Sequence, residues 1–496
     1  MISLTRADWT SRAEHLDIET RAFIQGSYCF AIKERTFDCL SPIDNRLLGA
    51  IARCDELDAD KAVISARVAF EQGVWAKMAP AKRKEIMLSF AEQIKVHAEE
   101  LALLETLDMG KPITDALTVD IPGSVRAIQW CAEAIDKLYD QIAPTSHDEI
   151  GMITREPIGV VAAIVPWNFP LLMSCWKLGP ALASGNSVIL KPSERSPLTA
   201  LRLAQLALDA GIPSGVLNVL PGFGSEVGKA LALHNDVDVV VFTGSTLTAK
   251  KLMVYSGESN MKRVWLEAGG KSPNIIFADA PDLDVAAQAA ASTIAFNQGE
   301  VCTAGSRLLV EDSIKEVFLE KLIKALNLWV PKNPLDPEAK MGAIVDKEHL
   351  DKILTYVDEG LQSGAKLRFG SHKVDCDKGF YLGTIVFDCV DQSMSIAQEE
   401  IFGPVLSVIT FSTTDEAIHI ANNTPYGLAA GIWTANLSKA HKTAKAIKAG
   451  SIWINHYDGG DMTAPFGGFK QSGNGRDKSL HAFDKYTELK STWIRL

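Results

Sequence analysis

The residue best suited to chemistry in this chain is a cysteine in a glycine-bracketed loop. Cys302 lies in the stretch NQGEVCTAGS, between Gly299 and Gly305. Glycines let a backbone approach a ligand closely, and a thiol in a polar loop can become an activated nucleophile. Other cysteines, such as Cys175 in LLMSCWKLG and Cys389 in IVFDCV, fit buried core positions better. We therefore interpret Cys302 as a candidate nucleophile, although its local context also allows an unreactive thiol.

A nucleophilic thiol needs a base and a group that stabilises negative charge. Glu267 lies in LEAGGK, just before two glycines, where apolar surroundings can raise the pKa of a carboxyl group so that it acts near neutral pH. Asn168 in PWNFP can donate its amide to a developing oxyanion. A surface glutamate and a turn-forming asparagine are the simpler interpretations of these two residues. None of the ten histidines lies within the glycine-bracketed segments, so Glu267 is the preferred base.

Three further stretches could bind a nucleotide. KPSE ends an apolar run and places Lys191 and Glu194 where open α/β sheets bind ligands, so the pair could hold ribose hydroxyls; a solvated loop pair is the alternative. FTGS follows the run VDVVV and could open a helix whose N-terminus faces an anion. GFGSEVG nearly offers G-x-G-x-x-G, but Val227 takes the place of the third glycine, and an ordinary strand-to-helix turn is the simpler interpretation.

The elements that must position these residues alternate between strand and helix patterns. Residues 60–141 are Ala-rich and charged with few strand-like runs, which predicts helices. Residues 160–277 alternate short β-branched runs, such as GVVAAIVP and NSVILKP, with helical stretches, and a second series of this kind covers residues 284–453. Buried apolar strands separated by helices indicate a parallel sheet. We therefore predict an α/β fold with two doubly wound domains.

Two strand-like segments lie outside both series. Residues 149–156 form an isolated strand pattern, and the tail from Ser479 alternates side chains in the same way. Strands outside the domain cores can extend a sheet in an oligomer. An ordinary edge strand within one chain explains them equally well.

The composition is that of a globular protein and narrows the function. The chain has 496 residues, 47% of them apolar and 22% charged, with 50 basic and 61 acidic residues and a net charge of −11. This balance excludes a disordered or fibrous protein and argues against nucleic acid or an anionic membrane as a partner. The eight cysteines form no C-x-x-C pair, so we expect free thiols and no metal site. Neither a signal peptide nor a run long enough to cross a membrane is found, which predicts a cytoplasmic protein.

Seven motifs occur in one order along nearly the whole chain: PWNFP, KPSE, FTGS, LEAGGK, NQGEVCTAG, EEIFGPV and PFGGFKQSG. In the order and spacing of these motifs the sequence resembles the NAD(P)-dependent aldehyde dehydrogenases. The resemblance implies two Rossmann-like domains, a cofactor-binding domain of residues 1–137 and 157–267 and a catalytic domain of residues 268–470. It also implies a small β oligomerisation element of residues 138–156 and 471–496, and hence a homodimer or homotetramer.

The resemblance further implies a two-step oxidation of a small aldehyde to an acid. Cys302 attacks the aldehyde carbon, and the Asn168 side chain and the Cys302 backbone N–H hold the oxyanion. After hydride transfer to the nicotinamide, Glu267 activates the water that hydrolyses the thioester. A cofactor-free cysteine acyl hydrolase would also explain these three residues, but it leaves KPSE, FTGS and EEIFGPV without a purpose.

The cofactor that the resemblance implies is NAD, with NADP less favoured because the Glu194 carboxylate would repel a 2′-phosphate. Lys191 and Glu194 would hold the adenosine ribose, and Glu400 the nicotinamide ribose. Ala249 departs from the G-S-T-x-x-G pattern of the family, which weakens the expectation for local helix packing. The implied cofactor-binding residues are Ile164, Pro166, Trp167, Lys191, Ser193, Glu194, Gly224, Gly228, Phe242, Gly244, Ser245, Glu400 and Phe402.

The substrate is implied less directly. The residues expected to line the access tunnel are Phe169, Met173, Trp176, Val301, Thr303, Asp458, Asp461 and Phe466. Asp458 and Asp461 add negative charge to an apolar lining, which suits a polar, amine-bearing aldehyde; two solvated turn residues are the alternative. VPWNFPLL and GDMTAPFGGFKQSGNGRDKSLHAF look especially like the group that acts on γ-glutamyl-γ-aminobutyraldehyde in putrescine (polyamine) breakdown. Free ω-aminoaldehydes, betaine aldehyde, 3-hydroxypropanal and succinic semialdehyde stay open.

Overall fold

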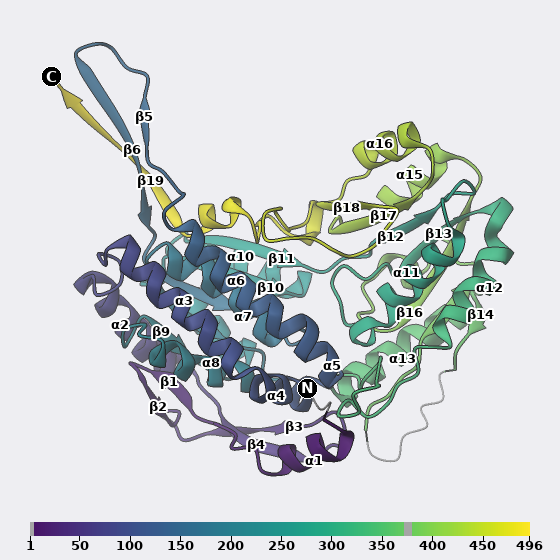
Figure 1. Ribbon diagram of the computed structural model, residues 1–496, viewed down its shortest axis with the longest axis horizontal. Helices are drawn as coiled ribbons and strands as arrows, with labels where there is room; N and C mark the ends of the chain where they lie inside the picture. The colour runs from purple at the N-terminus through teal and green to yellow at the C-terminus, as the bar shows by residue number, and fades with distance from the viewer. Residues whose placement is uncertain (1–3, 372–378) are drawn as a thin grey trace.

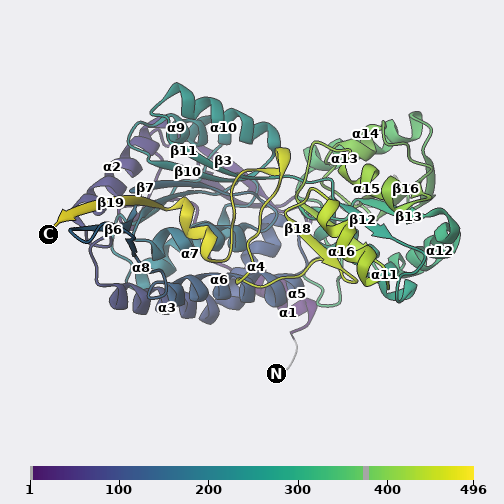
Figure 2. The same ribbon diagram turned by 90° about the horizontal axis from the view of Figure 1, so that it is seen from above.

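Two α/β units lie side by side in the molecule, and a narrow antiparallel arm projects from the first of them (Figure 1). The structure is a computed structural model that describes residues 4–371 and 379–496. Seen from above, the arm carries the C-terminus away from both units (Figure 2). The arm and the two units are therefore three separate places in which the sequence-predicted sites can be sought.

The first unit is built on a seven-stranded sheet. The strands from β11 to β9 run parallel, and the chain order reverses between β7 and β10. Such a switch point is where open parallel sheets bind ligands, outside the carboxyl ends of the strands. In sheet order the strands are β11 (Arg263–Ala268), β10 (Val239–Gly244), β7 (Val160–Ile164), β8 (Ser187–Lys191), β9 (Leu217–Val219), β1 (Ala22–Ile24) and β2 (Ser27–Cys29).

Helices cover both faces of this sheet, which explains why β7 is apolar throughout. Val161 and Ala163 pack into one core cluster, whereas Val160, Ala162 and Ile164 pack into another, as the two-residue period of a strand requires. The first face is covered by α3 (Pro80–Val96), α4 (Ala98–Met109), α6 (Ile121–Ala134), α7 (Pro170–Ala183) and α8 (Leu198–Asp209). The second face is covered by α2 (Glu56–Gln72), α9 (Lys229–Leu233) and α10 (Thr246–Glu258). The helices predicted for residues 60–141 are confirmed.

The second unit repeats the design with a second seven-stranded sheet, whose chain order reverses between β12 and β17. Its strands are, in sheet order, β14 (Lys366–Phe369), β15 (Ile385–Asp388), β16 (Val405–Phe411), β13 (Arg307–Glu311), β12 (Pro273–Ile276), β17 (Ala429–Trp433) and β18 (Ser451–Ile454). One face is covered by α11 (Leu283–Ala295) and α12 (Lys315–Leu326), the other by α13 (Lys347–Gln362) and α15 (Thr414–Asn422). The predicted α/β fold with two doubly wound units is confirmed, and the exact domain limits stay a prediction.

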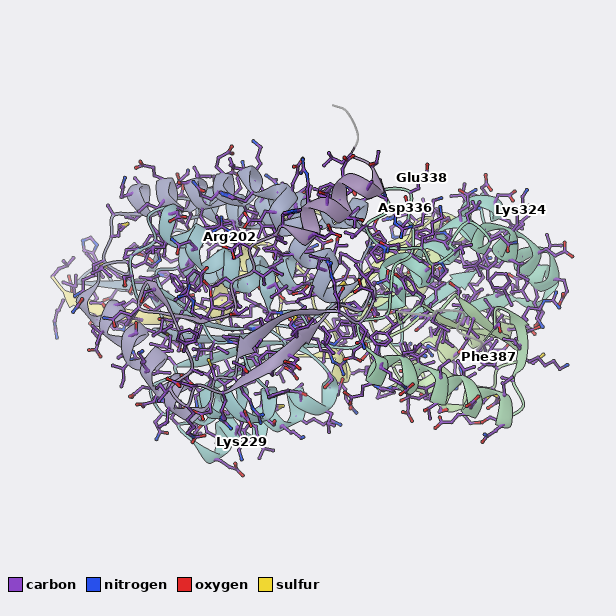
Figure 3. The ribbon with its side chains drawn as sticks, turned by 90° about the horizontal axis from the view of Figure 1, so that it is seen from below. Arg202, Lys229, Lys324, Asp336, Glu338 and Phe387 are labelled. Atoms are coloured by element: carbon purple, nitrogen blue, oxygen red, sulfur yellow. The ribbon has the colours of Figure 1, made fainter. Side chains whose placement is uncertain are left out.

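The side chains follow the same division between inside and outside. Phe387 of β15 is fully buried within the second unit, whereas Lys229 and Lys324 point outward from α9 and α12 (Figure 3). The two units also contain α1 (Arg6–Glu14), the hairpin of β3 (Thr36–Leu40) and β4 (Leu47–Ala52), α5 (Ile113–Asp115), α14 (Ser395–Gln398) and α16 (Leu437–Ala446).

The arm is a three-stranded antiparallel sheet. Its strand β6 (Glu149–Pro157) pairs with β19 (Thr487–Arg495) on one edge and with β5 (Gln141–Ala143) on the other. The strand predicted for residues 149–156 is confirmed. The strand predicted from Ser479 is wrong in its start, because residues 480–485 form a 3-10 turn that begins after Ser479, at a left-handed φ of 50°. A role of the arm in oligomer contacts stays a prediction.

The cysteines agree with the prediction except at one position. The seven described cysteines are free thiols, and Cys175 is buried, but Cys389 is exposed at a left-handed φ of 55° just beyond β15. Cys376 lies outside the described residues. Within residues 4–371 and 379–496 no helix is long and apolar enough to cross a membrane, and no group of three or more His, Cys, Asp or Glu side chains could hold a metal ion.

Candidate active site

The stretch LEAGGK joins the last strand of the first sheet to the first strand of the second. At both of its glycines, neighbouring atoms leave no room for a side chain. A Cβ on Gly269 would overlap a carboxylate oxygen of Glu400, and one on Gly270 would lie 2.7 Å from the carbonyl oxygen of Cys302. The Gly270 N–H donates to Glu400 Oε1 at 3.0 Å. The segment that connects the two units therefore brings together the end of the strand that carries Glu267, the side chain of Glu400 and the backbone of Cys302.

The Cys302 loop begins with a strained turn. After α11, the backbone φ angles of Asn297, Gln298 and Gly299 are 47°, 56° and 72°. For the two residues that are not glycine, such a conformation costs of order 1 kcal/mol each. Hydrogen bonds hold the turn in place, because Gln298 Oε1 accepts from the N–H of Gly342 at 2.8 Å. Strain held by surrounding structure is typical of functional loops.

Asn168 reaches the same loop from the first unit. Its buried side chain donates from Nδ2 to the carbonyl oxygen of Glu300 at 2.8 Å, and Asn297 Nδ2 donates to the carbonyl oxygen of Asn168 at 3.2 Å. A side-chain amide carries two N–H donors, so one Asn168 N–H is left for a ligand. Glu300 itself is fully buried, accepts from the Val345 N–H at 3.0 Å, and has its pKa raised by burial. Sequence reasoning missed Glu300 as a residue that holds this loop.

The Cys302 thiol is protonated in this environment. Burial raises its pKa to about 12, and the negative charges of Glu400, Asp458 and Glu267 act in the same direction. The thiolate, not the thiol, is the nucleophile. The sequence-predicted nucleophile therefore depends on a base that can take its proton.

Glu267 has the properties expected of such a base. It is 4% exposed, and within residues 4–371 and 379–496 neither of its carboxylate oxygens has a hydrogen-bond partner. Burial raises its pKa well above the usual value, Asp477 adds to the rise, and Lys177 and Lys485 oppose it. A glycine-rich loop closes over the carboxylate, because a Cβ on Gly467 would lie 2.7 Å from Glu267 Oε1. A buried carboxyl group without a partner can accept a proton near neutral pH.

A cluster of three buried ions lies behind Glu267. We call Lys177, Asp477 and Lys485 the lysine–aspartate cluster. Lys177 Nζ lies 2.5 Å from Asp477 Oδ2, and Lys485 forms an ion pair with the other oxygen of Asp477. Burial alone would raise the pKa of Asp477, but the two lysines outweigh burial and hold that pKa below its usual value. Sequence reasoning gave no role to this cluster, since its members come from distant parts of the chain.

The residues predicted to bind a cofactor gather at the switch point of the first sheet. Ile164 of β7 pairs in register with Phe242 of β10 and with Lys191 of β8. Lys191 Nζ forms an ion pair with Glu194 Oε2 at 3.1 Å. A Cβ on Gly244 would lie 2.5 Å from the Phe242 ring, so that position must be glycine.

The rest of the predicted cofactor set lies around the same edge. Trp167 packs edge-on against Phe402 with ring centroids 5.2 Å apart. Ser245 caps α10 by accepting from the Thr248 N–H, and Pro166 and Ser193 follow β7 and β8. Gly224 and Gly228 bound a short π-helix, and apart from chain neighbours and the backbone of that helix, no heavy atom of the described residues lies within 4 Å of a Cβ built on either. The protein's own packing does not require these two glycines, so the space beside them can admit a ligand. Ala249 is buried in the core cluster that also contains residues of α9 and α2, so the fold accommodates an alanine where the family pattern has a glycine.

Aromatic rings form the mouth of the site. Trp176 and Phe466 meet at a centroid distance of 5.3 Å, and Phe169 stacks on Phe296 at 6.3 Å. Phe296 and Lys478, whose ammonium nitrogen lies 4.5 Å from the Trp176 ring centroid, were missed by sequence reasoning. The aromatic pairs bring together segments that are up to about 290 residues apart, a proximity that sequence spacing does not reveal.

The other predicted lining residues lie on three segments. Met173 is buried on α7, and Val301 and Thr303 are buried on either side of Cys302. Asp458 is exposed, at a left-handed φ of 54°. Asp461 is exposed, and its carboxylate accepts from the Thr463 N–H at 3.0 Å.

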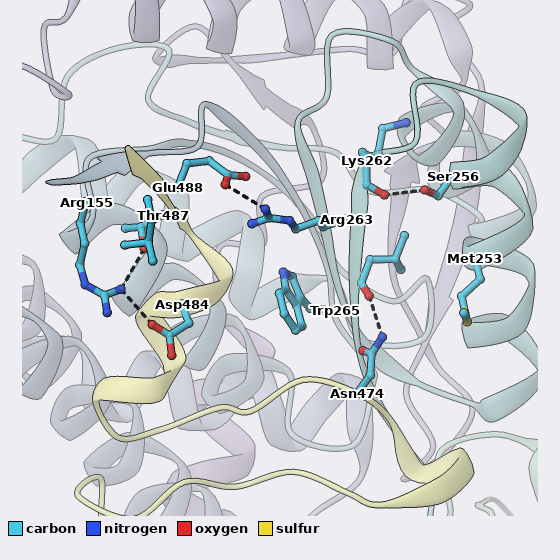
Figure 4. A pocket seen from close by; sticks show the side chains of 12 residues that line it. Arg155, Met253, Ser256, Lys262, Arg263, Trp265, Asn474, Asp484, Thr487 and Glu488 are labelled. Carbon is cyan, nitrogen blue, oxygen red and sulfur yellow. Dashed lines mark hydrogen bonds and ion pairs between the residues drawn. The ribbon is translucent and has the colours of Figure 1, made fainter. Parts of the chain in front are cut away.

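A separate open pocket of about 840 Å³ lies where the arm meets the first sheet (Figure 4). Its walls carry ion pairs of Arg263 with Glu488 and of Arg155 with Asp484, each at 2.9 Å. None of the residues predicted to act on substrate or cofactor lines it. This pocket therefore lies at the base of the arm and is separate from the site around Cys302.

Comparison with known proteins gives a single family. The aldehyde dehydrogenase family model matches residues 30–492. PuuC of Escherichia coli, an NADP/NAD-dependent aldehyde dehydrogenase, is 54% identical over 99% of this chain and 98% of the relative.

Two solved structures are similar to this chain over its whole length. The C302A mutant of the P. syringae indole-3-acetaldehyde dehydrogenase AldA, in complex with NAD+ and IAA, is 68% identical with a TM-score of 0.99 over 100% of both chains. The γ-glutamyl-γ-aminobutyraldehyde dehydrogenase of Burkholderia cenocepacia is 58% identical with a TM-score of 0.98 over 99% of this chain and 100% of the other. The chain therefore belongs to the aldehyde dehydrogenase family.

Proposed function

We propose that this enzyme uses NAD to oxidise γ-glutamyl-γ-aminobutyraldehyde, or a related ω-aminoaldehyde of putrescine breakdown, to the carboxylic acid. The observation that carries the hydrolytic outcome is Glu267, a buried carboxylate that has no hydrogen-bond partner in the part of the chain that the structure describes and that interacts electrostatically with the Cys302 thiol. The substrate class is supported by PuuC and by the Burkholderia relative, whose name states that aldehyde.

The residues of this chain divide the reaction between them. Cys302 loses its thiol proton to a base, and its sulfur forms a bond to the aldehyde carbon. The free Asn168 N–H and the Cys302 backbone N–H stabilise the oxyanion that results. When bound, NAD supplies the acceptor for the hydride that leaves this adduct, so that a thioester remains. Glu267 then takes a proton from water, whose oxygen attacks the thioester carbon and releases the acid and the thiol.

The cofactor preference follows from charge at the ribose site. In the proposal, Lys191 and Glu194 hold the adenosine ribose and Glu400 holds the nicotinamide ribose. The carboxylate of Glu194 is ionised, since burial, which would raise its pKa, is outweighed by Lys191, and the net pKa is lowered. A negative charge at that position disfavours a 2′-phosphate, which supports NAD over NADP. The proposal also includes a cytoplasmic homodimer or homotetramer that assembles through the arm.

Indole-3-acetaldehyde is a second candidate substrate. AldA, named for that aldehyde, is 68% identical to this chain, and the mouth formed by Trp176, Phe466 and Phe169 could stack on an indole ring. Stacking of this kind requires no carboxylate or amine group on the substrate.

The test is NADH formation by the purified enzyme with γ-glutamyl-γ-aminobutyraldehyde, 4-aminobutanal and indole-3-acetaldehyde at matched low concentrations. A much higher kcat/KM for the glutamylated aldehyde supports the proposal, whereas comparable values for the first two indicate a general ω-aminoaldehyde dehydrogenase. A higher value for the indole aldehyde would overturn the substrate assignment. The same assay with NADP in place of NAD tests the cofactor preference.

A further inference from the structure

Lys478 places an ammonium group at the mouth that forms no ion pair in the described part of the chain. Its nitrogen lies 4.5 Å from the ring centroid of Trp176 and 5.6 Å from that of Phe466. A cation over aromatic faces is stabilised by the ring electrons. Across residues 4–371 and 379–496, no carboxylate lies within ion-pair distance of Lys478, whereas the nearby Lys177 and Lys485 both pair with Asp477. Lys478 is therefore the lysine of this region whose charge is still available to a ligand.

The backbone holds Lys478 firmly at this place. Lys478 and Ser479 have left-handed φ angles of 56° and 50°, a conformation that residues other than glycine adopt only when their surroundings enforce it. The flanking hydrogen bonds do so. Asp477 and Phe466 exchange both backbone hydrogen bonds, at 2.7 and 2.8 Å, and the Ser479 N–H donates to the carbonyl oxygen of Met462 at 2.7 Å.

Lys478 is also close enough to the reacting atoms to sense their charge. Burial lowers its pKa, and the charges that oppose this fall are Asp458, Asp477, Asp461 and the Cys302 sulfur. The surrounding groups are thus acidic, and two of them, Asp458 and Asp461, lie on the exposed loop of the mouth. A partly desolvated ammonium group gains most from an anion that arrives with the substrate.

We propose that Lys478 binds a carboxylate at the far end of the aldehyde substrate, and so selects aldehydes that carry an acidic group remote from the carbonyl. This role rests on the proposed function, because the γ-glutamyl group ends in an amino acid carboxylate. The ammonium group of the same amino acid would find Asp458 and Asp461, whose carboxylates interact electrostatically with Lys478, on the exposed loop of the mouth. Lys478 is a specificity residue, and the aromatic rings beneath it fix its position.

The experiment compares three aldehydes of one skeleton. γ-Glutamyl-γ-aminobutyraldehyde carries both charges, N-glutaryl-4-aminobutanal carries only the carboxylate, and N-acetyl-4-aminobutanal carries neither. The readout is the ratio of kcat/KM for each carboxylate-bearing aldehyde to that for the N-acetyl aldehyde. This ratio cancels any effect of the variant on folding or on the Cys302 thiol. We expect Lys478→Met to lower both ratios by roughly tenfold, and Lys478→Arg to keep most of the preference. Lys442→Met, which removes an exposed lysine of α16, is the matched control and leaves the ratios unchanged.

The outcomes separate this role from the proposed function. If the wild type prefers the carboxylate-bearing aldehydes and Lys478→Met keeps that preference, the role of Lys478 is wrong and the proposed substrate stands. If the preference for the N-glutaryl aldehyde depends on Lys478 but the γ-glutamyl aldehyde is a poor substrate, the role of Lys478 stands and the proposed substrate is wrong. A wild type without any preference for a carboxylate overturns the role of Lys478.

Discussion

The two sides of Cys302 differ in how their charges are arranged. Behind Glu267, the lysine–aspartate cluster is almost completely buried and its ions are paired directly. At the mouth, Asp458, Asp461 and Lys478 are exposed or half-buried, and no ion pair found among residues 4–371 and 379–496 joins two of these three. Burial explains the difference, because a buried charge without a partner costs several kcal/mol whereas an exposed one costs little.

This difference assigns separate tasks to the two sides. A change in the buried cluster disturbs folding and the pKa of Glu267 together, since all three of its members act on that carboxyl group. A change at the mouth alters what binds there and leaves the core intact. The mouth is therefore the side on which related enzymes can differ in substrate while they keep one chemistry.

The largest effect is expected where the two sides meet. Cys302→Ser replaces the sulfur nucleophile with a hydroxyl of much higher pKa, so aldehyde oxidation should fall by about a thousandfold or more. NAD binding should persist, because the proposed cofactor residues lie at the switch point of the first sheet. NADH formation and cofactor titration by fluorescence measure the two quantities. A variant that oxidises aldehyde at the wild-type rate would show that another residue is the nucleophile.

Glu267→Gln should slow the second half of the reaction most. The amide has the same shape but cannot take a proton from the thiol or from water, so one equivalent of NADH should form, more slowly than in the wild type, and steady turnover should then fall by about a hundredfold or more. Rapid-mixing absorbance measurements resolve the burst from the steady rate. Steady turnover at the wild-type level near neutral pH would mean that a different base hydrolyses the thioester.

Asp477→Asn tests the buried side directly. It leaves Lys177 and Lys485 buried without their counterion, which should cost about 3–5 kcal/mol in the free energy of unfolding. The folded-state pKa of Asp477 is lowered, so its ionised form stabilises the protein above the pKa of the unfolded state, and this contribution disappears as the pH falls through the folded-state pKa. Denaturant unfolding at neutral and acidic pH measures both effects.

The control for this variant is an exposed pair. Glu85→Gln removes a surface ion pair with Lys82, both of whose side chains are more than half exposed, and should cost less than about 1 kcal/mol. If the two variants lose the same stability, the buried cluster does not support the fold in the way that its burial indicates.

The sequence patterns predicted more of the fold than of the residues that surround the site. Buried runs such as VVAAI indicated parallel strands because two-sided burial removes polar alternation. The placement of Glu267 near Cys302 could be anticipated from the shared motifs, and the glycines of LEAGGK explain it in structural terms. Lys177 and Glu300 could not be anticipated, since their roles depend on contacts between separate segments: Lys177 pairs with Asp477, 300 residues further along the chain, and Glu300 accepts from the Val345 N–H. The prediction placed the start of β19 too early, because no local sequence pattern indicates that Ser479 adopts a left-handed backbone conformation.

The pH dependence of turnover should follow Glu267. Its raised pKa means that the ionised form, which is the active base, becomes populated only as the pH rises. Below that pKa, the steady rate should therefore increase by up to about tenfold for each unit of pH. Steady-state kcat measured across the neutral range checks this, with Glu267→Gln as the control that should lose this dependence. A wild-type kcat that decreases as the pH rises would contradict the assignment of Glu267 as the base.

The smallest effect is expected at Asp461, an exposed charge of the mouth. The Asp461 carboxylate accepts a hydrogen bond from the Thr463 N–H, and the amide oxygen of an asparagine can accept the same bond. Asp461→Asn therefore keeps the turn and removes only a solvent-screened charge, so kcat/KM for 4-aminobutanal should change by less than about twofold. Asp458→Asn in the same assay should have the larger effect, because Asp458 interacts electrostatically with Cys302 and Lys478. Equal losses in the two variants would show that the mouth attracts a cationic substrate by its summed charge, whereas unequal losses locate the recognition at the residue nearer the thiol.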